Sequence, residues 1–224
     1  MRQPSVNACV KIGLVSGPRQ YGGLSGADRI AERRRRFVAA GLDLMGTKGI
    51  PATTLRGVAE RAGLAARYFA ESFPTIEDLH IAVFDDIVAE LEQRGLAAIA
   101  DTEGGPRARS RAALGALADL VLTDQRKGRV ILIESGSSPA LGPRRLAEAQ
   151  RFAGIVAGLN GPGGSATDLR LAAQFVIGGV GETLTAVLLG AIKVDREHLI
   201  DMLNELLFAS LRAVRPPADA IRTG

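Results

Sequence analysis

Residues 53–73, Thr-Thr-Leu-Arg-Gly-Val-Ala-Glu-Arg-Ala-Gly-Leu-Ala-Ala-Arg-Tyr-Phe-Ala-Glu-Ser-Phe, decide the fold. Thr53 or Thr54 can cap a first short helix through its hydroxyl group, and Gly63 permits the positive φ angle that ends such a helix. From Ala65 the spacing predicts a second short helix. Two short helices around a tight turn indicate a helix-turn-helix, whose second helix enters the major groove of DNA. The apolar residues that follow at helical spacing on one face of the first helix are Leu55, Val58, Ala59 and Ala62.

The second helix has two distinct faces. Phe69 and Phe73 lie four residues apart and can share the inward face, which leaves Arg67 and Tyr68 on the outward face. Four consecutive arginines over 33–36 precede this region and suit contact with phosphates, although such a run can also be a solvated helix face. The predicted DNA contacts are Arg33, Arg34, Thr54, Arg56, Ala65, Ala66, Arg67, Tyr68 and Ser72.

Residues 36–79 resemble the DNA-binding domain of the TetR family of transcriptional regulators. The matching positions are Phe37, Ala40, Leu44 and Met45 in the first helix, Gly49 and 52–54 in the first turn, Arg56, Val58 and Ala59 in the second helix, 62–64 in the second turn, and Phe73, Glu77 and Leu79. Ala70 and Ile76 stand where many members carry the Tyr and Lys that touch phosphates, and Ala65 stands where a capping Ser or Thr is frequent. The resemblance implies a homodimer that reads a twofold operator.

The distribution of charge gives separate support for a DNA-binding head. The chain has a net charge of +4, but residues 1–72 hold 12 basic and 5 acidic residues, a net of +7. The remaining residues hold 16 basic and 19 acidic residues, a net of −3. A basic end on a mildly acidic body is expected where one end attracts phosphates and the other does something else.

The composition predicts an all-α protein. Apolar residues make up 46% of the chain and aromatic residues 4%, so the core consists mainly of small and aliphatic side chains. The apolar run 130–133 has no partner strand elsewhere and is predicted as a short buried helix. The predicted parts are a flexible arm over 1–24, a helix-turn-helix domain over 25–74, a ligand-binding and dimerisation domain over 75–214, and a tail over 215–224.

Reactive and metal-binding residues are scarce. Cys9 is the only cysteine, which excludes an internal disulfide, and His80 and His198 are too few for a metal cluster. We expect His80 to be a partly exposed helix residue, and we expect no metal and no cofactor. No run of 18 apolar residues occurs, and residues 1–24 lack the apolar core of a signal peptide. The expected location is therefore the cytoplasm, without membrane contact.

Helices are predicted over 76–99, 107–123, 143–159, 167–192 and 195–214, with a turn at Lys127 and Gly128 and a loop over 161–164. The last two helices have more apolar surface than one core needs, which predicts a dimer. Glu182 can belong to that interface or anchor a ligand. The predicted interface comprises Phe175, Gly178, Gly179, Glu182, Leu199, Leu203 and Leu206, and the predicted effector pocket comprises Leu117, Ile131, Glu134, Phe152, Phe175 and Glu182.

The favoured function is a repressor that a small lipophilic effector releases from a palindromic DNA operator. An all-helical enzyme is the first alternative, but no Ser, Cys or His nucleophile stands beside a base, and no acidic pair has metal-ligand spacing. The second alternative is a structural protein that binds DNA without sequence preference, which predicts strong salt dependence and no operator.

Overall fold

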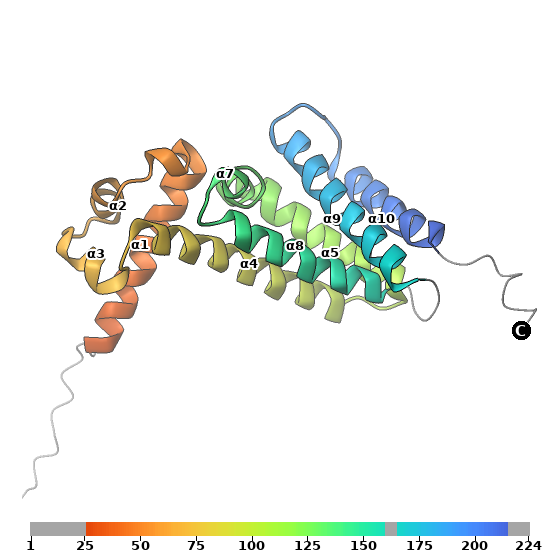
Figure 1. Cartoon of the computed structure of the whole chain (residues 1–224), viewed down its shortest axis with the longest axis horizontal. Coiled ribbons are helices and arrows are strands. Elements are labelled where there is room, and N and C mark those ends of the chain that lie inside the picture. The colour runs from red at the N-terminus through yellow and green to blue at the C-terminus, as the bar shows by residue number, and fades with distance from the viewer. Residues whose placement is uncertain (1–25, 160–164, 215–224) are drawn as a thin grey trace, which may run out of the picture.

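The computed structural model describes residues 26–159 and 165–214, which form a small helical head at one end of an elongated helical bundle (Figure 1). Within this described part every regular element is helical and no strand occurs, so the all-α prediction is confirmed. The predicted arm over 1–24 with its Cys9, the loop over 161–164 and the tail over 215–224 lie outside the described residues.

The head consists of α1 (Gly26–Lys48), η1 (Ile50–Ala52), α2 (Leu55–Ala62) and α3 (Arg67–Ser72). Phe37 of α1 and Phe69 of α3 are fully buried and meet edge to face, with ring centroids 5.3 Å apart. Such a pair adds about 0.5–1.5 kcal/mol beyond the area it buries. The core that forms around this pair fixes α3 against α1.

The two predicted ends of α2 are confirmed. Thr54 caps the helix, since its Oγ1 accepts a hydrogen bond from the Gly57 amide at 3.2 Å. Gly63 ends the helix in the left-handed conformation, with φ of 64°, which a residue with a Cβ adopts at a cost. Of the four apolar residues on one face, Val58, Ala59 and Ala62 are buried, whereas Leu55, the first residue of α2, is 40% exposed.

The second helix of the motif is shorter than predicted. It begins at Arg67 instead of Ala65, and Ala66 at its N-cap makes no side-chain hydrogen bond. An alanine has no oxygen to hold the free backbone amides of the first turn, so nothing extends the helix toward Ala65.

Helix α4 (Ile76–Ala100) belongs to both parts of the molecule. A capping box fixes its start, in which Thr75 accepts from the Asp78 amide and the Asp78 carboxylate accepts from the Thr75 amide. Its first turns bury Leu79 and Phe84 in the core of the head, and its later turns run along the bundle (Figure 1). His80 on this helix is 5% exposed, so its predicted partial exposure is wrong.

Behind α4 follow α5 (Pro106–Thr123), α6 (Gln125–Arg129), the π-helix η2 (Val130–Glu134), α7 (Ser135–Ser137) and α8 (Gly142–Gly158). The predicted turn at Lys127 and Gly128 is wrong, because both residues lie in α6. Asp124 caps this helix by accepting from the Arg126 amide at 3.2 Å. Gly128 allows close packing there, since a Cβ would lie 2.7 Å from the Val121 carbonyl oxygen.

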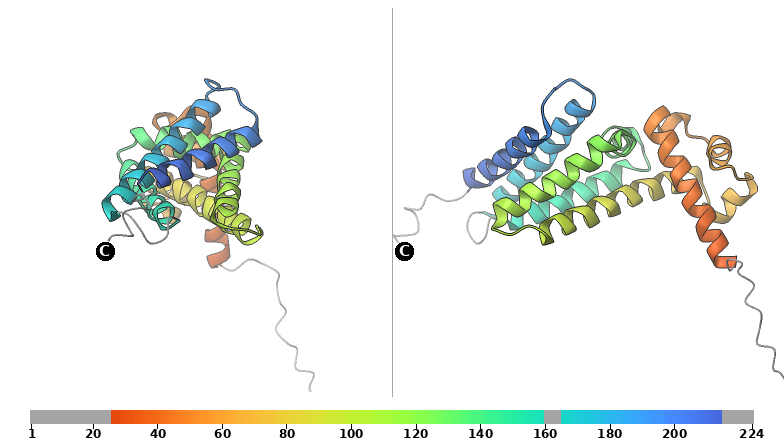
Figure 2. Two further views of the ribbon diagram at one scale, coloured as in Figure 1. Left: turned by 90° about the vertical axis from the view of Figure 1, so that its right-hand side faces the viewer. Right: turned by 180° about the vertical axis from the view of Figure 1, so that it is seen from behind.

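The chain ends in α9 (Ala166–Leu188) and α10 (Arg196–Ala213), which pack together beside α5 (Figure 2). Asp195 caps α10 as predicted, by accepting from the His198 amide at 2.9 Å. By length and composition alone α9 could cross a membrane. The same composition suits a helix that packs on its own bundle and on a partner, so it does not by itself indicate a membrane.

Candidate DNA-binding interface and regulatory core

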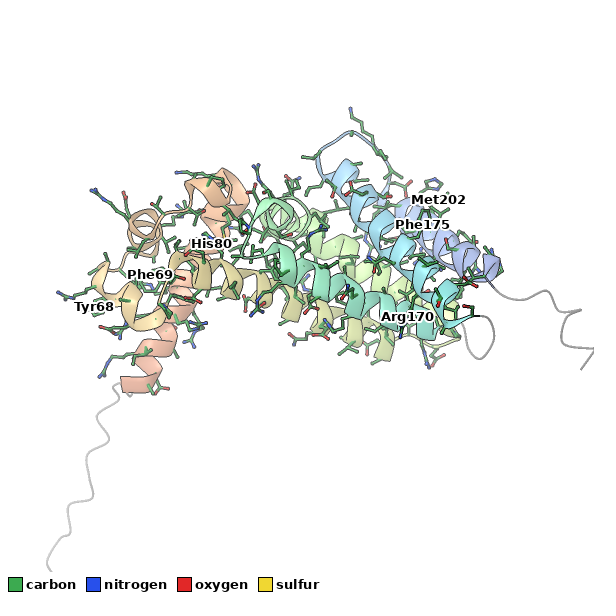
Figure 3. All side chains as sticks on the ribbon, viewed as in Figure 1. Tyr68, Phe69, His80, Arg170, Phe175 and Met202 are labelled. Atoms are coloured by element: carbon green, nitrogen blue, oxygen red, sulfur yellow. The ribbon has the colours of Figure 1, made fainter. Side chains whose placement is uncertain are left out.

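The outer face of α3 presents an arginine and a tyrosine together. Arg67 Nη2 donates to the Tyr68 hydroxyl at 3.2 Å, and its guanidinium lies 4.9 Å from the Tyr68 ring centroid. The hydrogen bond raises the pKa of Arg67. In Figure 3, Tyr68 lies at the outer margin of the head while Phe69 lies deeper, beside α1. Arg67 is exposed to solvent.

The other predicted contacts of the motif surround this pair. Arg56 in the first turn of α2 is exposed, and so are Ala65 and Ala66 before α3, where short side chains leave room for a close backbone. Ser72 is half-buried, and its hydroxyl donates to the Tyr68 carbonyl at 3.3 Å. Ser72 is thus partly engaged within the helix, whereas Arg56 is open to solvent.

Three of the four arginines over 33–36 in α1 contact α2, α3 or the residue after α3. Their guanidinium groups are therefore engaged within the head, which the prediction of phosphate contacts did not include. Arg33 pairs with Glu71 of α3 at 2.6 Å, and its guanidinium lies 4.7 Å from the Tyr68 ring centroid. Arg34 donates to the Ser72 carbonyl at 2.8 Å and stacks on Phe73. Arg36 donates to the Ala62 carbonyl at 2.6 Å, at the end of α2. These contacts hold α2 and α3 against α1.

Glu134 is a junction residue and not a pocket residue, contrary to the prediction. It is buried at the end of η2, where its carboxylate accepts from the Ile50 amide at 2.9 Å and from Arg129 Nε at 3.0 Å. Gly49, with φ of 84°, faces the same carboxylate. The Glu134 side chain of the larger domain thus holds the turn that precedes α2.

A second contact joins the two parts at Gly46 near the end of α1. A Cβ there would lie 2.3 Å from Arg126 Cβ and 2.6 Å from Arg126 Cα, so α6 touches α1 directly. Arg126 also reaches Asp43 of α1 at 3.2 Å and Asp124 at 2.9 Å. Sequence patterns could not reveal either junction, although a glycine inside a helix can signal such a close approach.

The residues predicted for the effector pocket lie in different surroundings. Leu117, Ile131 and Phe152 are half-buried in the bundle. Ile131 packs against two buried clusters, one within the bundle and one that joins the head to Leu120, Val130 and Leu141. Phe175 and Glu182 lie on the exposed side of α9, so their assignment to a pocket is wrong. A separate hollow of about 760 Å³, which the sequence did not predict, lies between α1 and α4.

The outer side of α9 and α10 carries exposed apolar side chains. Phe175 is 75% exposed and Leu206 is 56% exposed (Figure 3 labels Phe175). A Cβ added to Gly178 or Gly179 would meet nothing within 4 Å. Leu199 and Leu203 do not belong to this surface, because both are 4% exposed within the core of their own chain. We call Leu171, Phe175, Gly178, Gly179, Glu182, Met202 and Leu206 the outer face.

Comparison with known proteins matches this geometry. Residues 37–83 match the profile of the bacterial regulatory proteins of the tetR family. No curated protein matches the chain significantly in sequence. A TetR-like transcriptional regulator from Rhodococcus sp. RHA1 is 20% identical with a TM-score of 0.66, and the alignment covers 81% of this chain and 97% of that chain.

Two further solved structures share the fold. FadR from Bacillus subtilis, in complex with stearoyl-CoA, is 20% identical over 79% of this chain and 98% of its own, with a TM-score of 0.66. The multidrug-binding protein EbrR, complexed with imidazole, is 21% identical over 84% of this chain and 98% of its own, with a TM-score of 0.60. Residues 37–83 thus match the DNA-binding domain of the tetR family, and the chain shares its all-helical fold with TetR-like transcriptional regulators.

Proposed function

We propose that this protein is a homodimeric repressor that leaves a palindromic operator when a lipophilic molecule enters its larger domain. The proposal has four parts: the reading of DNA, the pairing of two copies, the binding of the effector, and the link between effector and DNA. Each part rests on particular contacts of the described residues.

Arg67 and Tyr68 are proposed to read the bases. They form the outward end of α3, and an arginine can donate two hydrogen bonds to a guanine in the major groove. Thr54 and Arg56 at the start of α2 are proposed to hold phosphates, and Ala65, Ala66 and Ser72 to line the approach of the DNA backbone. Arg33 and Arg34 are proposed to contribute positive charge from behind α3. Their partners within the head, Glu71 and the Ser72 carbonyl, hold the two side chains in place.

Two copies are proposed to pair through the outer face. Phe175 and Leu206 would otherwise hold large apolar side chains in water, and contiguous exposed apolar patches mark interaction surfaces. The open space above Gly178 and Gly179 admits a helix of a second copy at close range. A twofold pairing places two heads on one operator, as the symmetry of a palindrome requires.

The effector is proposed to be lipophilic and to bind near Leu117, Ile131 and Phe152. These side chains are apolar and half-buried, which suits a ligand that is bound mainly by burial of its hydrocarbon surface. FadR from Bacillus subtilis was solved with stearoyl-CoA and EbrR is described as multidrug-binding, so similar folds accommodate such molecules.

The observation that carries the proposal is the position of η2 between the two parts. Ile131 packs on the core of the bundle and on the buried cluster that joins the head to the bundle, and three residues later Glu134 accepts a hydrogen bond from the Ile50 amide of the head. A ligand that displaces Ile131 must move η2, and the Glu134 carboxylate moves with it. The effector therefore favours one arrangement of the head over another, which is the differential binding that a switch needs.

The test starts with selection of genomic fragments by the purified full-length protein and measurement of affinity for the selected site by fluorescence anisotropy. We expect a palindromic site that binds about 10³-fold or more tightly than random DNA, and release by palmitoyl-CoA but not by coenzyme A alone. Equal affinity for all sequences would reject the repressor, whereas release by coenzyme A alone would reject the lipophilic pocket.

A further inference from the structure

The buried histidine of α4 has an environment that none of the functions described above uses. His80 lies within the head at the start of α4 (Figure 3) and is 5% exposed. Its Nε2 atom is buried and has no hydrogen-bond partner among the described residues. A buried polar atom without a partner is uncommon in native proteins, so it calls for a physical explanation.

The ring is connected to the turn that precedes α2. It lies beside the backbone of Thr53, which acts to raise the pKa of the ring, and the Thr53 hydroxyl donates to the Gly49 carbonyl at 2.9 Å. Thr53 is directly followed by Thr54, the cap of α2. Ile50 in the same turn is held by Glu134. His80 therefore supports, from the side of α4, the turn that Glu134 supports from the larger domain.

The charged groups around the His80 ring stabilise its protonated form only weakly. Burial lowers the pKa of His80, and this effect exceeds the opposing effects of Glu77 and of the Thr53 backbone. Glu77 itself is exposed. The turn over 50–53 contains no titratable side chain. Asp43 of α1 is paired with Arg61 and Arg126, and Glu134 of η2 with Arg129.

We propose that His80 makes DNA binding sensitive to acid: protonation of its imidazole loosens the turn before α2 and thereby lowers the affinity of the head for its operator. The neutral ring fits because Nε2 then carries a lone pair and no hydrogen. The protonated ring carries an N–H at Nε2 that finds no acceptor in the described core, at a cost comparable to that of other unsatisfied buried donors. The ring can escape that cost only by turning toward water and releasing Thr53.

The direction of the pH effect follows from proton linkage. The folded head binds the His80 proton less readily than the unfolded chain does, because burial lowers the pKa in the folded state. Stability from this group is therefore complete above about pH 6.5, the ordinary pKa of histidine, and falls as the pH drops below it. Acid thus favours the loosened head, and DNA affinity falls in the same range.

The chain offers a matched control, because His80 and His198 are its only histidines and His198 is exposed on α10. Affinity for the selected operator is measured between about pH 7.5 and pH 5.5, a range chosen to bracket the histidine pKa, for wild type, His80→Asn and His198→Gln. Asparagine keeps a neutral donor near Thr53, and His80→Leu serves as a second variant if His80→Asn folds poorly.

We expect wild type and His198→Gln to lose about tenfold in affinity as the pH falls, the effect of one unsatisfied buried donor, and the His80 variants to lose clearly less. Urea unfolding over the same range, without DNA, should show the same difference. This second readout separates the inference from the DNA-binding function on which it rests. Equal losses in all variants, or an NMR titration in which His80 protonates as readily as His198, would overturn the acid sensor.

Discussion

Replacement of Gly46 by alanine should weaken the junction between head and bundle, although glycine to alanine normally strengthens a helix. The gain from helix propensity is about 0.5–1 kcal/mol. Against it, the new Cβ would lie 2.3 Å from Arg126 Cβ and 2.6 Å from Arg126 Cα. Because the second of these atoms belongs to backbone, α6 has to move, and such overpacking costs about 1–3 kcal/mol. The balance is a loss of about 0.5–2 kcal/mol.

Gly95→Ala is the matched control for this prediction. Gly95 lies inside α4, and its Cβ would meet nothing within 4 Å, so only the gain in helix propensity remains. Urea unfolding followed by circular dichroism should show Gly46→Ala below wild type and Gly95→Ala above it by about 0.5–1 kcal/mol. If both variants gained stability to the same extent, the close contact between α1 and α6 would be refuted.

Three further results are expected. Arg67→Ala should reduce the preference for the selected operator about tenfold or more per half-site, and an unchanged preference in anisotropy titrations would remove Arg67 from base reading. Phe175→Glu should give monomers at micromolar concentration in sedimentation equilibrium, because a charge in the paired outer face lacks a partner; a persistent dimer would place the interface elsewhere. Glu134→Gln should bind palmitoyl-CoA in a thermal-shift assay but release DNA less completely, since its amide oxygen bonds Ile50 more weakly than a carboxylate does; full release would exclude this link.

The sequence predicts the head well because local chemistry determines it. A threonine that caps α2 and a glycine that ends it act within a few residues of the chain. The inward positions of Phe69 and Phe73 follow from helical spacing, and the structure buries both. The start of α4 at Ile76 was predicted, but its capping box was not, although Thr75 and Asp78 have the spacing of that motif.

The roles of individual charged residues could not be predicted, because their partners lie far away in the chain. Glu134 meets Ile50 across 84 positions, and Arg33 meets Glu71 across 38. No periodicity within one helix carries that information. For the same reason Leu199 was assigned to the interface together with Phe175, although helical rotation puts Leu199 in the core of the chain and only Phe175 on the surface.

Because α4 is long, a small tilt of this helix moves the head by a large distance. Its 25 residues span about 37 Å at 1.5 Å per residue. Because its first turns are part of the head's core, the head follows the helix as one body. A tilt of about 5° at the far end moves the head by about 3 Å, close to the 3.4 Å between successive base steps. In the proposed dimer, two heads displaced in opposite directions would lose their register with a palindrome, so a motion smaller than one side chain would be enough to end binding.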